Sequence, residues 1–186
     1  GEGDANDSVG TSHGLPQNGV TYSTGEVGRA FSFDGVDDRI EVPRNAPTGA
    51  YTLEAWVKYT GSAYNERGDH WNTVVSFGSA APGLGVLEDG QLNLWPAIKG
   101  GSVPVGTWTH VAYTWDGSNS RLFVNGLQVA INNTAPSTNG TGMGIGYHGG
   151  NTPWLGLIDE VSLYSRALDP TKIRDLYAAG STGKCL

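Results

Sequence analysis

Residues 107–129, TWTHVAYTWDGSNSRLFVNGLQV, decide the fold class of this chain. Residues 107–115 are rich in β-branched and aromatic side chains, and successive side chains of a strand point to opposite faces. Asp116-Gly117 predicts a turn after this strand. Asn125-Gly126, between two further short runs, is the strongest hairpin signal in the chain. The stretch therefore predicts three successive strands joined by tight turns.

The same pattern of short strands and polar turns extends in both directions. Residues 30–33 and 39–42 flank the turn Asp34-Gly35, which predicts a β-hairpin. In residues 51–59 one face is apolar, and the other, with Glu54 and Lys58, is expected to be the wetter face. Further strands are predicted at 73–77, 85–87, 91–95, 144–147 and 155–164.

One short helix is predicted near the C-terminal end of the sequence. Asp169 is a favourable N-cap, Pro170 suits the first helical position, and Gly180 ends the apolar periodicity. The predicted fold is all-β, a two-sheet antiparallel sandwich or jelly roll with one short C-terminal helix. Since the chain has 186 residues and no visible linker or repeat, we expect a single domain over 1–186.

Composition excludes several classes of partner. The formal net charge of −7, without clusters of Lys or Arg, argues against nucleic-acid binding. No apolar run approaches the roughly 18 residues of a membrane span, so membrane insertion is not expected. Glycine, with 29 of 186 residues, is about twice as frequent as usual, which suits tight turns between short strands.

Four phrases in a fixed order resemble the laminin-G-like group of the concanavalin A-like lectin/glucanase superfamily. They are AFSFDGVDDRIEVP, YTLEAWVK, TWTHVAYTWDGSNSRLFVNGLQV and LGLIDEVSLYSRALDPTKIRDLY. The resemblance extends from about residue 1 to 177. It implies a jelly roll of two curved sheets that serves as a binding module of a larger secreted or cell-surface protein. Relatives usually begin with one more strand, so the resemblance implies a first strand before residue 1. The composition is more typical of a bacterial protein.

A catalytic site is not expected. Glycoside hydrolysis needs two carboxyl groups across a sugar cleft. Laminarinase-type relatives carry them on one strand as Glu-x-Asp-x-x-Glu, whereas here only the adjacent pair Asp159-Glu160 occurs, and adjacent residues point to opposite faces. No Gly-x-Ser-x-Gly sequence is present. A glycoside hydrolase or polysaccharide lyase-type enzyme remains a distant alternative.

Acidic turns predict a calcium site. Calcium takes six to eight oxygen ligands, and turns rich in Asp, Asn and Gly supply them. In relatives the opening loop and the strand that carries the Asp-Glu pair come together, and a structural calcium is common there. The resemblance therefore points to Asp7 and Asp159 as ligands, with Asp34 as a further candidate. The alternative is that these aspartates cap their own turns.

Two loops combine aromatic and planar polar side chains, which is the mixture that carbohydrate recognition needs. They are residues 64–72 and 147–154, and Trp95 at the end of a short strand offers a third stacking surface. The predicted ligand-binding residues are Tyr64, Asn65, His70, Trp71, Trp95, Tyr147, His148, Asn151 and Trp154.

These patterns predict a non-catalytic, calcium-stabilised carbohydrate-binding module. The expected partner is a polysaccharide or other glycan, and we expect a monomer. Adhesion to a protein partner and a purely architectural role are the alternatives.

Overall fold

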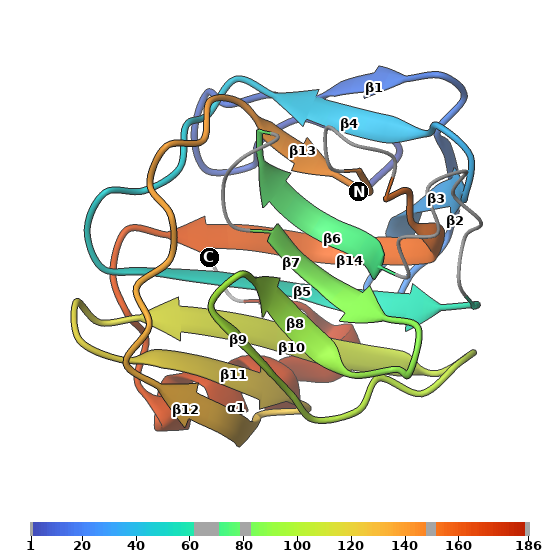
Figure 1. Cartoon of the computed structure of the whole chain (residues 1–186). Helices are drawn as coiled ribbons and strands as arrows, with labels where there is room; N and C mark the ends of the chain where they lie inside the picture. The colour runs from blue at the N-terminus through green and yellow to red at the C-terminus, as the bar shows by residue number, and fades with distance from the viewer. Residues whose placement is uncertain (1, 62–70, 79–82, 148–151, 185–186) are drawn as a thin grey trace.

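Two antiparallel sheets of seven strands each form a sandwich in the computed structural model, which describes residues 2–61, 71–78, 83–147 and 152–184 (Figure 1). The front sheet has the order β1 (Leu15–Gln17), β4 (Arg39–Val42), β13 (Met143–Ile145), β6 (Trp71–Phe77), β7 (Gly83–Leu87), β8 (Leu92–Trp95) and β9 (Ile98–Gly100). The back sheet has the order β12 (Leu127–Asn132), β11 (Ser120–Val124), β10 (Trp108–Trp115), β5 (Tyr51–Tyr59), β14 (Leu155–Tyr164), β3 (Arg29–Asp34) and β2 (Thr21–Thr24). The predicted jelly-roll sandwich is confirmed.

The strongest predicted hairpin is present. Asn125 and Gly126 have φ angles of 49° and 76°, so both occupy the left-handed region that a two-residue turn between twisted strands requires. This turn joins β11 to β12, which pair antiparallel. The hairpin predicted between 85–87 and 91–95 is also present, as β7 and β8.

The hairpin predicted over residues 30–42 is wrong. β3 pairs with β2 and β14 in the back sheet, whereas β4 pairs with β1 and β13 in the front sheet. The segment around Asp34-Gly35 is therefore a loop that connects β3 of the back sheet to β4 of the front sheet. The physical reason is that Phe31 and Phe33 of β3 and Ile40 of β4 all bury in the core between the sheets.

The main core fills the space between the sheets with large aromatic side chains. Trp154 has no exposed surface, and its ring centre lies 5.5 Å from that of Tyr59. Tyr51 and Tyr113 pack with ring centres 5.4 Å apart in the same core.

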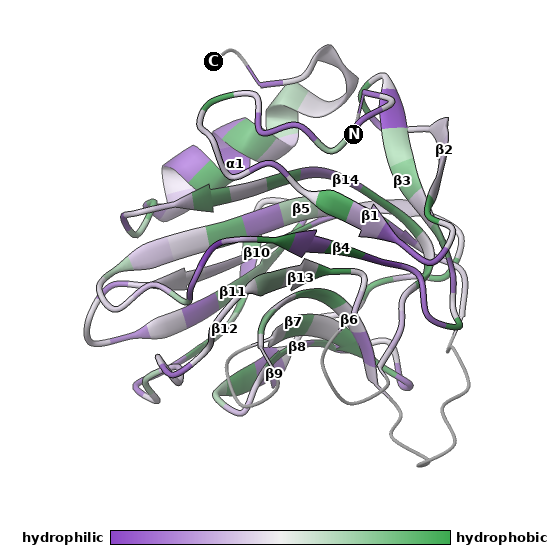
Figure 2. Cartoon of the chain, turned by 90° about the horizontal axis from the view of Figure 1, so that it is seen from above, coloured by the Kyte–Doolittle hydropathy of each residue, from purple (hydrophilic) through white to green (hydrophobic). Residues whose placement is uncertain are grey.

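A second, smaller core covers the outer face of the back sheet, where α1 (Pro170–Ala179) packs (Figure 2). The helix begins as predicted: Asp169 accepts a hydrogen bond from Lys172 N at 3.0 Å, and Gly180 is the C-cap. Ile173 of α1 and Leu168 bury against Phe123 and Ala112. The wetter face expected for residues 51–59 is thus wrong, because the helix and the C-terminal segment cover most of it.

Candidate functional site

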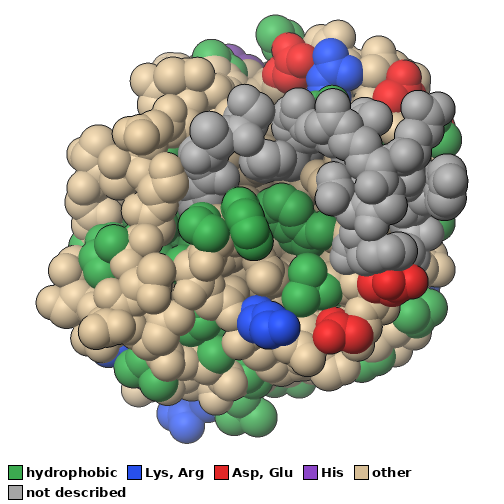
Figure 3. Space-filling view, in the orientation of Figure 1, with side chains coloured by type: hydrophobic (Ala, Val, Ile, Leu, Met, Phe, Trp, Pro, Cys, Tyr) green, Lys and Arg blue, Asp and Glu red, His purple; other side chains and the backbone are tan. Residues whose placement is uncertain are grey.

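The outer face of the front sheet is not covered by any helix that the structure describes, and apolar side chains line a hollow at its centre (Figures 1 and 3). Side chains alternate along a strand, and Leu84, Leu92 and Leu94 point into the core. The residues between them therefore face outward. Register places Thr73 opposite Gly85, Gly85 opposite Asn93, and Asn93 opposite Lys99. We call this surface the open face; it is formed by Trp71, Gly83, Gly85, Asn93, Trp95 and Lys99, whereas Thr73 is fully buried against Thr152.

The floor of the open face is flat because β7 contributes glycine. The indole of Trp71 lies across Gly85, where a Cβ would overlap its Nε1 atom. Trp71 is partly exposed, so the ring covers the sheet with one side and presents surface to solvent. The structure thus spreads an aromatic ring over the middle of the face.

Trp95 lies at the end of β8 and has 57% of its surface exposed, which is unusual for so large an apolar side chain. It borders a groove of about 600 Å³, together with Asn93, Lys99, Ile131 and Asn132. The side-chain oxygen of Asn93 is buried and has no hydrogen-bond partner among the described residues. An aromatic surface, an amide side chain and an ammonium group therefore line one groove.

A second hollow, of about 400 Å³, lies at the other side of the same sheet, over β4, β13 and β6. The Arg39 guanidinium lies 5.6 Å from the ring centre of Tyr147, and its Nε donates to Glu41 Oε1 at 2.8 Å. Ser76 Oγ donates to the backbone oxygen of Tyr147 at 2.8 Å, which fixes the chain at this point.

The predicted ligand-binding residues thus separate into four groups. Trp71 and Trp95 lie on the open face, and Tyr147 lines the second hollow. Trp154 does not belong to the site, because it is fully buried between the sheets and offers no surface to a ligand. The remaining predicted residues, Tyr64, Asn65, His70, His148 and Asn151, lie outside the described residues.

Sequence reasoning missed Asn93, Lys99 and Arg39. The signal that could have found Asn93 was its place between Leu92 and Leu94 in an alternating strand. Arg39 and Lys99 carried no comparable signal, because charged residues on short strands are ordinary solvent-facing residues.

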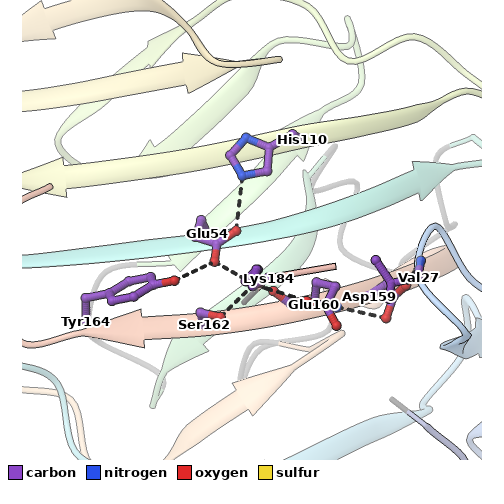
Figure 4. Close-up of polar contacts among 8 residues, drawn as sticks. All are labelled: Val27, Glu54, His110, Asp159, Glu160, Ser162, Tyr164 and Lys184. Atoms are coloured by element: carbon purple, nitrogen blue, oxygen red, sulfur yellow. Dashed lines mark hydrogen bonds and ion pairs between the residues drawn. The ribbon is translucent and has the colours of Figure 1, made fainter. Parts of the chain in front are cut away.

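All three predicted calcium ligands accept backbone hydrogen bonds, and Asp34 Oδ1 accepts from Val36 N at 2.8 Å. The Asp7 carboxylate accepts from the N–H groups of Gly10 at 2.9 Å, Val9 at 3.0 Å and Ser12 at 3.1 Å. These bonds, from Gly10 first, hold the pKa of Asp7 below its usual value. Asp159 accepts from Val27 N at 3.0 Å and from Glu160 N at 2.9 Å (Figure 4). Among the described residues, neither Asp7 nor Asp159 belongs to a group of three metal-capable side chains.

Asp34 instead gathers with Asp37 and Asp38 in the crossing between β3 and β4, where one oxygen of each lies within 4.8 Å of the others. Asp38 is only 4% exposed; its Oδ2 accepts from Asp34 N at 3.0 Å, and its Oδ1 has no partner among the described residues. Burial raises the pKa of Asp38 above its usual value. An orphaned buried oxygen beside two exposed carboxylates fits the oxygen chemistry that calcium prefers.

Comparison with known proteins connects this geometry to a family. The family described as the Concanavalin A-like lectin/glucanases superfamily, in its laminin-G-like group, matches residues 34–174. The chain belongs to this superfamily. A search of curated protein sequences gave no match.

Solved structures share the fold of this concanavalin A-like domain. Domain 4 of AbnA, an extracellular GH43 arabinanase from Geobacillus stearothermophilus in complex with arabinotriose, has a TM-score of 0.76 and 23% identity, with 92% of each chain covered. The binding domain of Paraclostridial Mosquitocidal Protein 1 has a TM-score of 0.73 and 15% identity, and that of botulinum neurotoxin serotype G has 0.67 and 13%. The alignments cover 90% and 92% of this chain and 47% of each toxin domain. These likenesses establish the fold.

Glu54, one of two carboxylates with no exposed surface among the described residues of the concanavalin A-like domain, serves structure. It is fully buried on the outer side of β5, where it contacts His110 Nε2 at 3.1 Å, Lys184 Nζ at 2.6 Å and the Tyr164 hydroxyl at 3.4 Å (Figure 4). Burial alone would raise the pKa of Glu54, but His110 and Lys184 outweigh it, and the pKa is lowered. The charge of this carboxylate is therefore compensated inside the protein.

Among the described residues, no helix is long and apolar enough to span a membrane.

Proposed function

We propose that this domain is a non-catalytic carbohydrate-binding module and that the open face is its binding surface. The observation that carries the proposal is a pair of tryptophans on this face: the Trp71 indole lies against Gly85, and Trp95 is 57% exposed two strands from β6. Large aromatic side chains are seldom so exposed, and a patch of them on one face of a protein indicates a binding site.

The polar groups beside the rings favour sugar over a protein partner. Ligand sites combine apolar surface with a few placed polar groups that fix orientation. Here Asn93 and Lys99 line the groove beside Trp95, and the Lys99 ammonium offers hydrogen-bond donors to sugar hydroxyls. An adhesive patch for a protein would need no such alignment.

The comparisons add support from proteins of the same fold. Domain 4 of AbnA was solved with arabinotriose bound, and its parent is an extracellular arabinanase. The toxin domains are binding domains. We therefore infer a secreted or cell-surface setting and choose arabinan as the first polysaccharide to test. The binding-only role is supported by Glu54, whose charge is satisfied by His110 and Lys184 beneath the C-terminal segment.

Binding to a panel of soluble polysaccharides, by affinity electrophoresis and then by calorimetry, tests the function. Trp95→Ala and Trp71→Ala are each expected to weaken binding at least about tenfold, which corresponds to about 1.4 kcal/mol. Leu127→Ala is the matched control, because Leu127 is 67% exposed on β12 and does not line the groove. Unchanged binding in both tryptophan variants would place the site elsewhere, and no binding to any polysaccharide would contradict the function.

We also propose that the domain holds a structural Ca²⁺ at Asp34, Asp37 and Asp38 rather than at Asp7 and Asp159. The unpartnered Oδ1 of the buried Asp38 supports this assignment, since a buried carboxylate oxygen without a partner is costly unless a cation compensates it. Calorimetric titration with CaCl₂ of protein from which a chelator has removed metal tests this proposal. Asp38→Asn is expected to abolish calcium binding, and Asp7→Asn is expected to leave it unchanged.

A further inference from the structure

Two loops that pass between the sheets meet at one corner of the sandwich (Figure 1). The turn Asn18-Gly19 leads from β1 of the front sheet to β2 of the back sheet. Residues 35–38 lead in the opposite direction, from β3 of the back sheet to β4 of the front sheet. Register places Gln17 opposite Arg39, so the last residue of β1 lies beside the first residue of β4. The two loops are therefore neighbours in space.

An amide group and a buried carboxylate make the contact between the loops. Asn18 Nδ2 donates to the backbone oxygen of Asp37 at 3.0 Å. A Cβ added to Gly19 would lie 3.3 Å from Asp38 Oδ1, so this buried oxygen faces the turn. Within the part of the chain that the structure describes, neither Asp38 Oδ1 nor Asn18 Oδ1 has a hydrogen-bond partner. Each loop therefore brings an unpartnered oxygen to the same corner.

Negative charge accumulates at this corner. Asp34, Asp37 and Asp38 bring one oxygen each within 4.8 Å of one another, and none of them forms an ion pair with another described residue. Burial, and to a smaller extent the charges of Asp34 and Asp37, raise the pKa of Asp38. Like charges so close repel one another, and a divalent cation among them would replace this repulsion with attraction.

The strands that this corner connects have few other attachments. β1 has three residues and β2 has four, and each is the outermost strand of its sheet with a single neighbour. None of their residues is fully buried. Segments with few buried contacts open locally at a lower free-energy cost than the core does. Since the turn Asn18-Gly19 joins the two strands, a bond from this turn to residues 35–38 holds both of them.

We propose that the Ca²⁺ at Asp34, Asp37 and Asp38 takes the side-chain oxygen of Asn18 as a further ligand and thereby clamps β1 and β2 to the rest of the sandwich. This inference rests on the calcium site proposed above and deepens it, because it adds a ligand from the second loop and a conformational role. Calcium accepts carboxylate and amide oxygens in one coordination shell. The bond from Asn18 Nδ2 to Asp37 restricts the amide in advance, which lowers the entropy cost of ligation.

Amide hydrogen exchange, measured in CaCl₂ and in excess EGTA, tests the clamp. Removal of calcium is expected to speed exchange over residues 15–24 by at least about tenfold, because β1 and β2 then open locally. Peptides from β5 and β10 should stay protected under both conditions. An equal change throughout the chain, or no change over residues 15–24 in protein that binds calcium, would overturn the clamp and leave the calcium site intact.

Variants of Asn18 test the added ligand by calorimetric titration with CaCl₂. Asn18→Gly suits the φ angle of 65° but lacks the amide, and it is expected to weaken calcium binding by at least about tenfold. Asn18→Asp keeps a side-chain oxygen and should retain binding. Asn139→Gly, at an exposed Asn-Gly pair outside the corner, is the matched control and should bind as wild type does. Wild-type affinity in Asn18→Gly would show that Asn18 is not a ligand. Wild-type protein that binds no calcium would overturn the site and, with it, the clamp.

Discussion

The ammonium group of Lys184 lies 2.6 Å from Glu54 Oε1, which ties the C-terminal segment to the middle of β5 (Figure 4). The same ammonium donates to the backbone oxygen of Glu160 at 2.5 Å and to Ser162 Oγ at 2.7 Å, both on β14. The Lys184 side chain is only 10% exposed. One lysine thus connects two adjacent strands of the back sheet from outside.

Lys184→Met is expected to lower the free energy of unfolding by about 3 kcal/mol, because removing one partner of a buried ion pair leaves the other charge without compensation. Chemical denaturation measures the change. The double variant Lys184→Met with Glu54→Gln should lie nearer to wild type, since no buried charge remains unpaired. Lys172→Met, which removes a solvent-exposed pair with Asp175, is the control and should change stability by less than about 0.5 kcal/mol. An equal loss in both lysine variants would contradict the role of Lys184.

The lowered pKa of Glu54 predicts the sign of one acid effect. A carboxyl whose folded-state pKa lies below its unfolded value of 4.5 contributes stability above that value, and the contribution is lost as pH falls through the folded pKa. The groups that face it are His110 of β10, Tyr164 of β14 and Lys184 of the C-terminal segment. Denaturation midpoints taken from about pH 6 to about pH 3 should therefore fall more steeply for wild type than for Glu54→Gln. Parallel slopes would show that Glu54 does not titrate differently in the two states.

Trp154 and Trp95 should respond to truncation in opposite ways. Trp154→Ala is expected to cost about 3–5 kcal/mol of stability, because it opens a cavity in the main core beside Tyr59. Trp95→Ala should change stability by less than about 0.5 kcal/mol, because that ring is largely exposed. Thermal and chemical unfolding distinguish the two variants. A large loss of stability in Trp95→Ala would mean that its binding defect reflects damage to the fold.

Gly85→Ala should displace the ring of Trp71. The new Cβ would overlap the indole and lie 2.5 Å from the backbone oxygen of Asn72, so we expect a loss of about 1–3 kcal/mol from overpacking, together with weaker glycan binding. Tryptophan fluorescence and calorimetry report the two effects. Gly49→Ala is the matched control, because nothing lies within 4 Å of a Cβ at Gly49. Full binding by folded Gly85→Ala protein would exclude Trp71 from the site.

Calcium is expected to raise the midpoint of thermal unfolding, because a ligand that binds only the folded state stabilises it by RT ln(1 + [L]/Kd). Excess chelator should reverse the shift. In Asp38→Asn the shift should vanish, whereas in Asp159→Asn it should persist, although that variant loses bonds to Val27 and Glu160. A shift that disappears in Asp159→Asn and remains in Asp38→Asn would show that the metal binds at Asp7 and Asp159 instead.

Local signals in the sequence predicted local structure well. The Asn125-Gly126 hairpin and the Asp169 cap depend on backbone conformations that a few neighbouring residues determine. The Asp34-Gly35 turn was predicted correctly as a change of direction, but the turn alone cannot say in which sheet the next strand pairs. That choice depends on β13, about 100 residues later in the chain, which pairs with β4.

Burial of particular side chains was harder to predict, because distant segments decide it. Glu54 looked like a solvent-facing residue, and only the arrival of Lys184 and α1 on that side buries it. Trp154 precedes a strand, as a loop aromatic does, yet its ring turns inward against Tyr59. Trp71 and Trp95 were predicted as ligand-binding residues from their surroundings in the sequence, but no sequence pattern indicated that the Trp71 indole lies over Gly85.

The attachment of Lys184 to Glu54 also determines how the domain can be immobilised. Glu54 points away from the front sheet, so the described chain ends on the side of α1, with both sheets between it and the Trp95 groove (Figure 2). A biotin or a solid support coupled at the C-terminal end would therefore leave the groove facing solution. A sensor surface prepared in this way presents the Trp95 groove to a passing polymer.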